Sequence, residues 1–314
     1  MTTPVSRQGY YDYPVVKRPV WTWEVPVYFW LGGIGSGAFI ITSLVQRFGS
    51  RDDARSTADG FYLAAAALLP CTPLLIKDLG RPDRFHHMLR VFKPLSPMNL
   101  GAWTLAALTP VALIRAGVRA ADEGRLPSLA QGLVTLVPRP LVELAGSMLG
   151  LVLAGYTGVL LAATNVPLWA RSKLLGGLFT ASAFSSGSAS LSLVAACRGG
   201  SGATLYRLGL VETAASAAEL GLLAGYVAQS GGAARALTSR RLAAPFWLGA
   251  VAAGMALPLL LHRLAGRRPG RRSRALATVA SLAAVGGSLA LRWSIFEAGK
   301  DSSDDQAASF ALSS

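Results

Sequence analysis

The chain has 314 residues, of which 52% are hydrophobic and 15% are charged, whereas soluble domains carry about 25% charged residues. With a mean hydropathy of +0.43, it has too little polar surface to cover a soluble globule and is typical of a polytopic membrane protein. The net charge of +14 lies in short segments between apolar runs, as the flanks of membrane spans do, which argues against nucleic-acid binding.

Residues 1–20 contain prolines, tyrosines and charges but no apolar core of the signal-peptide type, so we expect the first span to direct insertion. Eight apolar runs follow, each long enough to cross a bilayer. The sequence predicts an all-α fold, a polytopic membrane bundle of about eight transmembrane helices, with an N-terminal interfacial segment at 1–23, the bundle at 24–298 and a polar tail at 299–314. The runs lie near 24–47, 58–77, 98–118, 140–163, 174–197, 205–229, 243–264 and 275–297.

Two features inside these runs bear on packing. Pro70 and Pro73 are expected to break the second span, and the small residues of LGGIGSGAF (31–39) and SAFSSGSAS (182–190) favour close helix contacts. The first of these stretches also fits a loose GxGxxA pattern, but no strand precedes it and no acidic residue follows at the required distance, so we reject a dinucleotide site.

Eight spans place both termini on one side of the membrane. The two sides carry 14 and 15 Lys and Arg residues, and five of the 14 belong to the connection at 77–97. Without those five, the positive-inside rule predicts that both termini lie outside. The arginines between the last two spans are then expected on the cytoplasmic side near anionic lipid.

The connection between the second and third spans, KDLGRPDRFHHMLRVFKPLSPMNLGAW at 77–103, concentrates titratable groups at the membrane boundary. It has a break at Arg81 and Pro82, and Ser96 followed by Pro97 predicts the next helix start. A solvated loop is the ordinary interpretation of such a segment. Aspartate and histidine at this depth can also bond and protonate a quinone ring, which makes Asp78, Arg81, His86 and His87 candidates.

Neither cysteine belongs to a CxxC pair, so Cys71 and Cys197 alone cannot build an iron–sulfur cluster or a zinc site. The three histidines are His86, His87 and His262, and no two of them are placed to clamp haem inside the bundle. The sequence therefore predicts neither haem nor metal in this chain.

Charges inside the spans are costly and usually functional. Glu212 and Glu219 are seven residues apart and share a helix face, and Arg292 lies in the last span. With Glu143, which lies near a helix start, they are candidates for a proton path. A structural Glu–Arg pair is an equally good interpretation.

Four patches resemble the NrfD/PsrC family of membrane subunits from polysulfide reductase and related complexes. They are WEVPVYFWLGG (23–33), DLGRPDRF followed by SPMNLGAW (78–103), GYTGVLLAATNVPLWA (155–170) and LRWSIFEAGKDSSDD (291–305). The resemblance implies an eight-helix bundle without haem that binds menaquinone or ubiquinone near the face where a ferredoxin-like [4Fe–4S] subunit docks. That subunit in turn links to a molybdopterin-type or other catalytic redox subunit.

By this resemblance, Tyr156 of the YTG motif contacts quinone, and Trp23, Glu24 and Tyr28 at the opening of the first helix line the site. Asn99 and Trp103 belong to the same set of candidates through the SPMNLGAW motif. Judged from the residues alone, a tyrosine beside glycines more often packs in the core. The aromatic residues at the start of the first helix likewise fit a belt at the membrane interface. We expect the charged connection to fold back against the opening of the first helix and the middle of the fourth.

The sequence thus predicts a multi-pass protein of the bacterial inner membrane that exchanges electrons between the iron–sulfur partner and quinone, with proton uptake or release. A proton-translocating module of a larger respiratory assembly, of the alternative complex III type, stays open. A secondary transporter is disfavoured because the halves show no repeat.

Overall fold

The computed structural model describes residues 16–127, 131, 132, 134, 136–266 and 270–304, and every regular element among them is helical. Eight helical segments are long and apolar enough to cross a membrane, which confirms the predicted fold class. They are Glu24–Phe48, Arg51–Asp78, Pro97–Asp122, Arg139–Ala162, Leu174–Cys197, Gly202–Thr238, Pro245–Ala265 and Arg271–Ser303.

Several spans are composite. The second consists of α2 (Arg51–Thr57), α3 (Gly60–Leu68) and α4 (Cys71–Asp78), with the interruption between α3 and α4 falling at Pro70, as the prolines predict. The sixth joins α10 (Gly202–Ser230) to the 3₁₀ segment Gly231–Thr238, and the seventh joins the π-helical Pro245–Ala256 to α11 (Leu257–Ala265). The remaining spans are α1 (Glu24–Phe48), α5 (Pro97–Asp122), α7 (Arg139–Ala162), α9 (Leu174–Cys197) and α12 (Arg271–Ser303).

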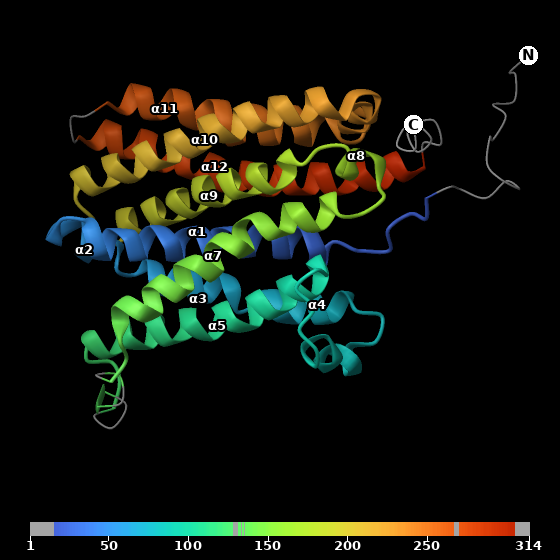
Figure 1. Cartoon of the computed structure of the whole chain (residues 1–314). Helices are drawn as coiled ribbons and strands as arrows, with labels where there is room; N and C mark the ends of the chain where they lie inside the picture. The colour runs from blue at the N-terminus through green and yellow to red at the C-terminus, as the bar shows by residue number, and fades with distance from the viewer. Residues whose placement is uncertain (1–15, 128–130, 133, 135, 267–269, 305–314) are drawn as a thin grey trace, which may run out of the picture.

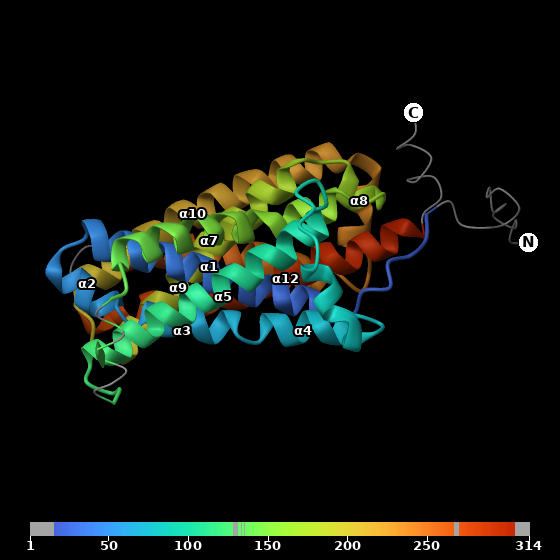
Figure 2. The same ribbon diagram turned by 60° about the horizontal axis from the view of Figure 1, so that its bottom comes forward.

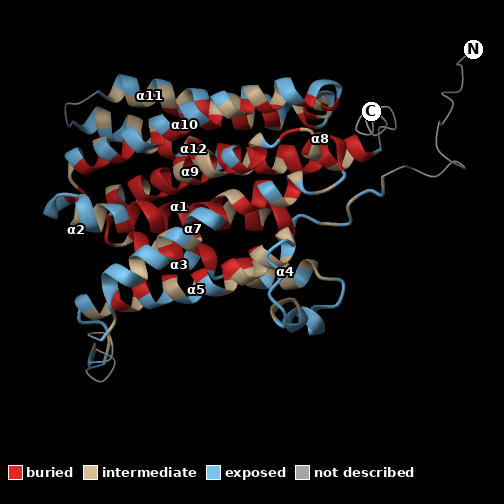
Figure 3. Cartoon of the chain, viewed as in Figure 1, coloured by how far each residue is buried: buried red, intermediate tan, exposed pale blue. Residues whose placement is uncertain are grey.

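Helices α1 and α9 form the centre of the bundle (Figures 1 and 3). Each has 78% of its most apolar stretch buried, against 22–44% for the other six spans. Helices α3, α5 and α7 pack on one side of this central pair, and α10, α11 and α12 pack on the other (Figure 1). Figure 2 shows α4 continuing the line of α3 along one edge of the bundle. The outer helices turn large apolar side chains such as Leu141, Leu248 and Leu282 outward, as a surface in lipid requires.

Small residues allow the two central helices, α1 and α9, to approach each other closely. A Cβ atom at Gly37 of α1 would overlap the carbonyl oxygen of Ala183 in α9, and one at Gly187 of α9 would meet the backbone of Gly37 at 2.8 Å. The backbones therefore touch directly, as small-residue faces allow in membranes. Both of these glycines lie in the two stretches that the sequence singled out for close packing.

The two ends of the described chain lie at the same end of the bundle. Arg18 forms ion pairs with Asp304 at 2.6 Å and with Asp301 at 3.4 Å, and Lys300 donates a hydrogen bond to the Trp21 carbonyl at 3.1 Å. The segment before α1 is thus fastened to the last turns of α12, which continues five residues beyond the expected end of the bundle at 298.

Candidate functional site

One cavity of about 250 Å³ lies at the end of the bundle where the two chain ends meet. Three segments far apart in the sequence enclose it: the opening of α1, the end of α4 with the turn after it, and the C-terminal part of α7, with α5 completing the wall. The lining is mostly apolar. It consists of Val20, Trp21, Val25, Tyr28, Phe29, Thr72, Leu75, Ile76, Asp78, Leu79, Gly80, Phe85, Met88, Leu89, Met98, Ala102, Leu105, Ala106, Tyr156 and Leu160.

Helical spacing explains which side chains reach the cavity. Val25, Tyr28 and Phe29 follow the i, i+3, i+4 pattern that places residues on one face of α1. The chain leaves α4 at Leu79 and re-forms as the 3₁₀ helix Pro82–Leu89. That short helix packs against α4 and α5 and brings Phe85, Met88 and Leu89 to the cavity wall.

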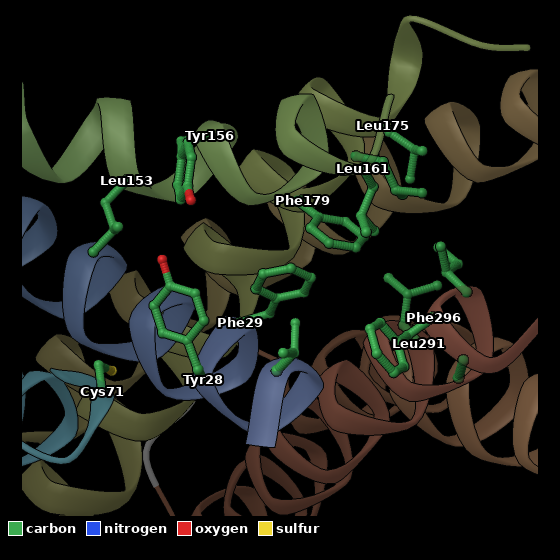
Figure 4. Packing of buried hydrophobic residues seen from close by; sticks show 14 of the residues in the cluster. Tyr28, Phe29, Cys71, Leu153, Tyr156, Leu161, Leu175, Phe179, Leu291 and Phe296 are labelled. Atoms are coloured by element: carbon green, nitrogen blue, oxygen red, sulfur yellow. The ribbon is translucent and has the colours of Figure 1, made fainter. Parts of the chain in front are cut away.

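Two tyrosine hydroxyl groups are the most buried polar atoms at this cavity. Tyr28 from α1 and Tyr156 from α7 point their hydroxyl groups toward one another (Figure 4), and the side chains are 0% and 7% exposed. The Tyr28 hydroxyl makes no hydrogen bond of acceptable geometry with any described residue. Since a buried polar group without a partner costs about 1–3 kcal/mol, this atom is available to a ligand.

The position of the Tyr156 ring depends on a glycine in the SPMNLGAW motif. A Cβ atom at Gly101 of α5 would fall directly on the phenol ring of Tyr156. Any other residue at this position would push the ring away from the cavity. The motif therefore needs glycine here for a packing reason that the sequence alone does not show.

Asp78 lies half-buried at the mouth of the cavity. Its Oδ1 atom accepts hydrogen bonds from the Thr22 amide at 3.0 Å and the Thr22 hydroxyl at 2.9 Å. The Thr22 hydroxyl also contacts Glu24, and Glu24 pairs with Lys77 at 3.1 Å. Lys77 lies 4.7 Å from the centroid of the Trp23 ring. Thus Trp23 and Glu24 belong to the rim of the site, and neither lines the cavity.

Five other candidates lie outside the cavity wall. Arg81, His86 and His87 are exposed on the connecting turn, with the two histidine rings 4.4 Å apart. Asn99 fastens this turn, because it accepts from the Lys93 amide at 2.6 Å and donates to the Met88 and Val91 carbonyls at 2.7 and 3.0 Å. Trp103 packs edge-on against Phe92 at 6.0 Å.

The intramembrane charges separate into two groups, and Glu143 has a partner that the sequence analysis missed. Arg115 of α5 pairs with Glu143 of α7 at 2.6 Å, and its guanidinium lies 4.0 Å from the Phe61 ring centroid. By sequence, Arg115 counts among the cations that flank the spans. Its position inside the apolar run 98–118 is the signal that it lies within the bundle.

Glu212, Glu219 and Arg292 occupy the other half of the bundle, and all three are buried. Glu212 accepts from Ser281 at 2.9 Å and lies 3.0 Å from His262 Nε2. Arg292 donates to Ser182 at 2.8 Å and forms no ion pair with Glu219 within the described residues.

A wall of the cavity that sequence reasoning missed comes from Val20 and Trp21. Trp21 stacks on Trp169 at 6.0 Å, and Lys300 holds its carbonyl. The only signal in the sequence is the aromatic residue before the first span, which fits a membrane-interface belt equally well. Within the described residues, no group of three or more His, Cys, Asp or Glu side chains is placed to hold a metal ion.

Eight membrane-length helices, with one largely apolar cavity below the turn that joins the second and third spans, define a multi-pass membrane protein. The chain belongs to the NrfD family, because the family model "Polysulphide reductase, NrfD" matches residues 14–301.

Relatives support this assignment over nearly their whole length. The C subunit of polysulfide reductase from Wolinella succinogenes is 32% identical over 303 residues, covering 90% of the present sequence and 94% of the relative. Protein NrfD of Escherichia coli is 27% identical, with 90% and 95% covered, and the Protein NrfD homolog of Haemophilus influenzae is 25% identical, with 92% and 98% covered.

The Arg115–Glu143 pair supports a stability prediction. In Arg115→Met the Glu143 carboxylate loses its counter-charge, so we expect the free energy of unfolding to fall by about 3 kcal/mol, as for other pairs cut off from water. The double variant Arg115→Met/Glu143→Leu should recover most of the loss. Unfolding of the detergent-solubilised protein in a denaturant series measures both.

Arg139→Gln is the matched control, since Arg139 pairs with Asp122 at 2.7 Å on the exposed surface. Arg139→Gln should lower the free energy of unfolding by less than about 1 kcal/mol. Equal losses in Arg115→Met and Arg139→Gln would show that the buried pair contributes no more than a surface pair.

Proposed function

We propose that this protein is the quinone-reactive membrane subunit of a bacterial respiratory oxidoreductase complex. It exchanges electrons between a ferredoxin-like [4Fe–4S] subunit and menaquinone or ubiquinone bound in the cavity between α1, α5 and α7. The observation that carries the proposal is the pair of buried tyrosine hydroxyl groups that point toward one another in an otherwise apolar cavity with a carboxylate at its mouth.

The residues present fit a quinone. A quinone ring is flat and apolar, and its only polar groups are two carbonyl oxygens, which accept hydrogen bonds. Tyr28 and Tyr156 supply hydroxyl donors in the buried part of the cavity, and Phe29 and Leu160 supply apolar contact area. The volume of about 250 Å³ is near the lower end of the range for small-molecule sites, roughly 300–1,000 Å³, as expected when only the ring is enclosed.

The isoprenoid tail of a quinone needs a route to the lipid. The α5 wall of the cavity includes Met98, whose side chain is 45% exposed, and the partly exposed Ala102 and Ala106. This wall lies on the outer surface of the bundle, where the tail reaches the membrane without crossing the core.

Reduction of a bound quinone consumes two electrons and two protons, and oxidation of quinol releases them. Asp78 is placed to exchange these protons with water at the mouth, because one of its oxygens is held by Thr22 and the other is left for a ligand or water. The Tyr28 hydroxyl stays deeper and holds the ring by donating its proton in a hydrogen bond. The same groups serve either direction of electron flow.

The partner is proposed to dock over the turn at 77–97. This turn exposes Arg81, Arg84, Arg90 and Lys93 beside the cavity, which suits an acidic ferredoxin-like surface. A molybdopterin-type or other catalytic subunit would then exchange electrons through that partner.

The binding groups can be tested one at a time. We expect Tyr156→Phe, Tyr28→Phe and Asp78→Asn each to weaken binding of a fluorescent quinone analogue to the purified protein by about tenfold, the loss of one hydrogen bond or charge in a buried site. Tyr62→Phe is the control, because Tyr62 bonds Glu123 far from the cavity. Wild-type affinity in all three cavity variants would place the quinone elsewhere.

Gly101 provides a second test through geometry alone. Gly101→Ala should displace the Tyr156 ring and weaken the same analogue by about tenfold or more, whereas Gly117→Ala on the same helix, with open space around it, should leave binding unchanged. In a Tyr156→Leu background the Gly101 substitution should add nothing. If the single variant Gly101→Ala bound the analogue with wild-type affinity, the Tyr156 ring would not be part of the quinone site.

A second candidate function, proton translocation, rests on the polar face of α10. Glu212, Ser216 and Glu219 are buried on this face, and Ser185 lies 3.0 Å from Ser216. We propose this line of groups as a proton path that would make the protein a proton-translocating module of its complex.

Glu219→Gln removes the titratable group from this path. We expect it to lower the number of protons moved per electron in vesicles containing the whole complex, with quinone binding retained, because glutamine cannot carry the proton. Asp122→Asn, at an exposed surface pair, is the control. Unchanged coupling in Glu219→Gln would remove this residue from any path.

A further inference from the structure

A second cavity, of about 220 Å³, lies at the opposite end of the bundle from the candidate quinone cavity. The first turns of α10, the last turn of α11 and the first turns of α12 enclose it, at the left end of these three helices in Figure 1. Its wall combines cationic and hydroxyl-bearing side chains with apolar ones. Those used below include Arg263, Arg274, Ser273, His262, Leu205 and Ala277.

The cations at this cavity have no counter-charge among the described residues. Arg263 and Arg274 line it, and Arg271 and Arg272 begin the same helix as Arg274. All four are exposed, and none forms an ion pair or a side-chain hydrogen bond with a described residue. Two arginines without such partners on the cavity wall, with two more in the first turn of α12, make the cavity a site for an anion.

Several other arginines at this end of the bundle are neutralised, whereas Arg51 and Arg55 of α2 form no ion pair with a described residue. Arg119, Arg139 and Arg207 each pair with a carboxylate, namely Asp59, Asp122 and Asp53. Glu212, which lies 3.0 Å from the Nε2 atom of the cavity-lining His262, is fully buried and accepts a hydrogen bond from Ser281. It therefore leaves the exposed arginines unpaired.

The start of α12 adds a second attraction for negative charge. This helix has 33 residues, and Gly270 at its N-terminus has no side chain to cap it. Ser273 of its first turn lines the cavity. Unsatisfied amide groups at a helix start favour phosphate or carboxylate oxygens, so the helix and the arginines act on the same space.

The lower part of the site is apolar and open to the membrane. Leu205, Leu210 and Ala277 line the cavity, and Leu210 is 50% exposed on the outer surface of α10. A ligand that fits both parts has an anionic head and a hydrocarbon tail.

We propose that this cavity binds the phosphate group of an anionic phospholipid. Arg263 and Arg274 contact the phosphate, the start of α12 faces it, and an acyl tail lies along Leu205 and Leu210. The lipid supplies the negative charge that the described residues lack there and holds the ends of α10, α11 and α12 together. The proposal does not depend on the quinone site, which lies at the other end of the bundle.

The experiment uses the full-length protein in a neutral detergent, titrated with phosphatidylglycerol, phosphatidylcholine or inorganic phosphate and monitored by native mass spectrometry. We expect retained phosphatidylglycerol, little phosphatidylcholine because its choline cancels the charge, and no displacement by millimolar phosphate. Arg263→Gln/Arg274→Gln should weaken phosphatidylglycerol binding about tenfold or more, since each basic residue near a membrane surface contributes about 1 kcal/mol.

Two further variants distinguish lipid binding at this cavity from a general attraction of anionic lipid to positive charge. Arg51→Gln/Arg55→Gln removes two exposed arginines of α2, at the same end of the bundle, that form no ion pair with a described residue, and it should leave binding unchanged. Ala277→Phe keeps every charge but fills the cavity, and it should also abolish the preference for phosphatidylglycerol. The proposal fails if the two arginine pairs give equal losses, if Ala277→Phe binds normally, or if inorganic phosphate competes with the lipid.

Discussion

The candidate quinone cavity depends on one constraint: the backbone must leave the second span at Leu79 and fold back against α4 and α5 before it enters the third. Asn99 fixes this return from one side by bonding three backbone groups of the turn. Thr22 fixes it from the other by bonding Asp78. Because these bonds satisfy backbone and carboxylate groups that would otherwise lie unpaired at the membrane boundary, the turn has one favourable arrangement. That arrangement carries Phe85, Met88 and Leu89 to the cavity wall.

The sequence predicts the bundle well, because its main signals are local. Runs of about 20 apolar residues identify the spans, Pro70 places the break between α3 and α4, and Ser96 with Pro97 marks the start of α5. It also predicts that the charged turn, the opening of α1 and α7 contribute to one site, and residues of all three line the cavity. The expected packing was different, because the turn lies mainly against α4 and α5, and α7 contributes Tyr156 and Leu160 from near its C-terminal end. What it does not predict are contacts between side chains on different spans. To predict the close contact of Gly101 with Tyr156, or the ion pair of Arg115 with Glu143, one must know how each helix is rotated about its own axis. The sequence does not determine this rotation, because small residues that allow close packing occur on several faces of the helices.

The roles of individual candidate residues differ for the same reason. Motif membership treats Asp78, Asn99 and Trp103 alike, yet Asp78 lines the cavity, Asn99 uses its side chain on the backbone and Trp103 faces Phe92. A residue can belong to a motif because it contacts the ligand or because it positions another residue that does. The sequence looks the same in both cases. Only the partners of each atom distinguish them.

The distribution of charge gives the bundle a direction. At the end with the quinone cavity, several cations near the rim are tied to acids: Lys77 to Glu24, Arg18 to Asp304 and Lys300 to Glu297. At the other end, the arginines at the start of α12 have no such partners among the described residues. Unpaired basic residues are those that resist translocation and meet anionic lipid most strongly. The number of cations supports the same orientation: without the turn at 77–97, the α12-start end carries 15 Lys and Arg residues and the other end carries nine. We therefore propose that the α12 start faces the cytoplasm, which would place the quinone cavity on the outer side. A proton exchanged by Asp78 would then come from or go to the outer aqueous phase, and any proton reaching Glu212 would come from the inner one.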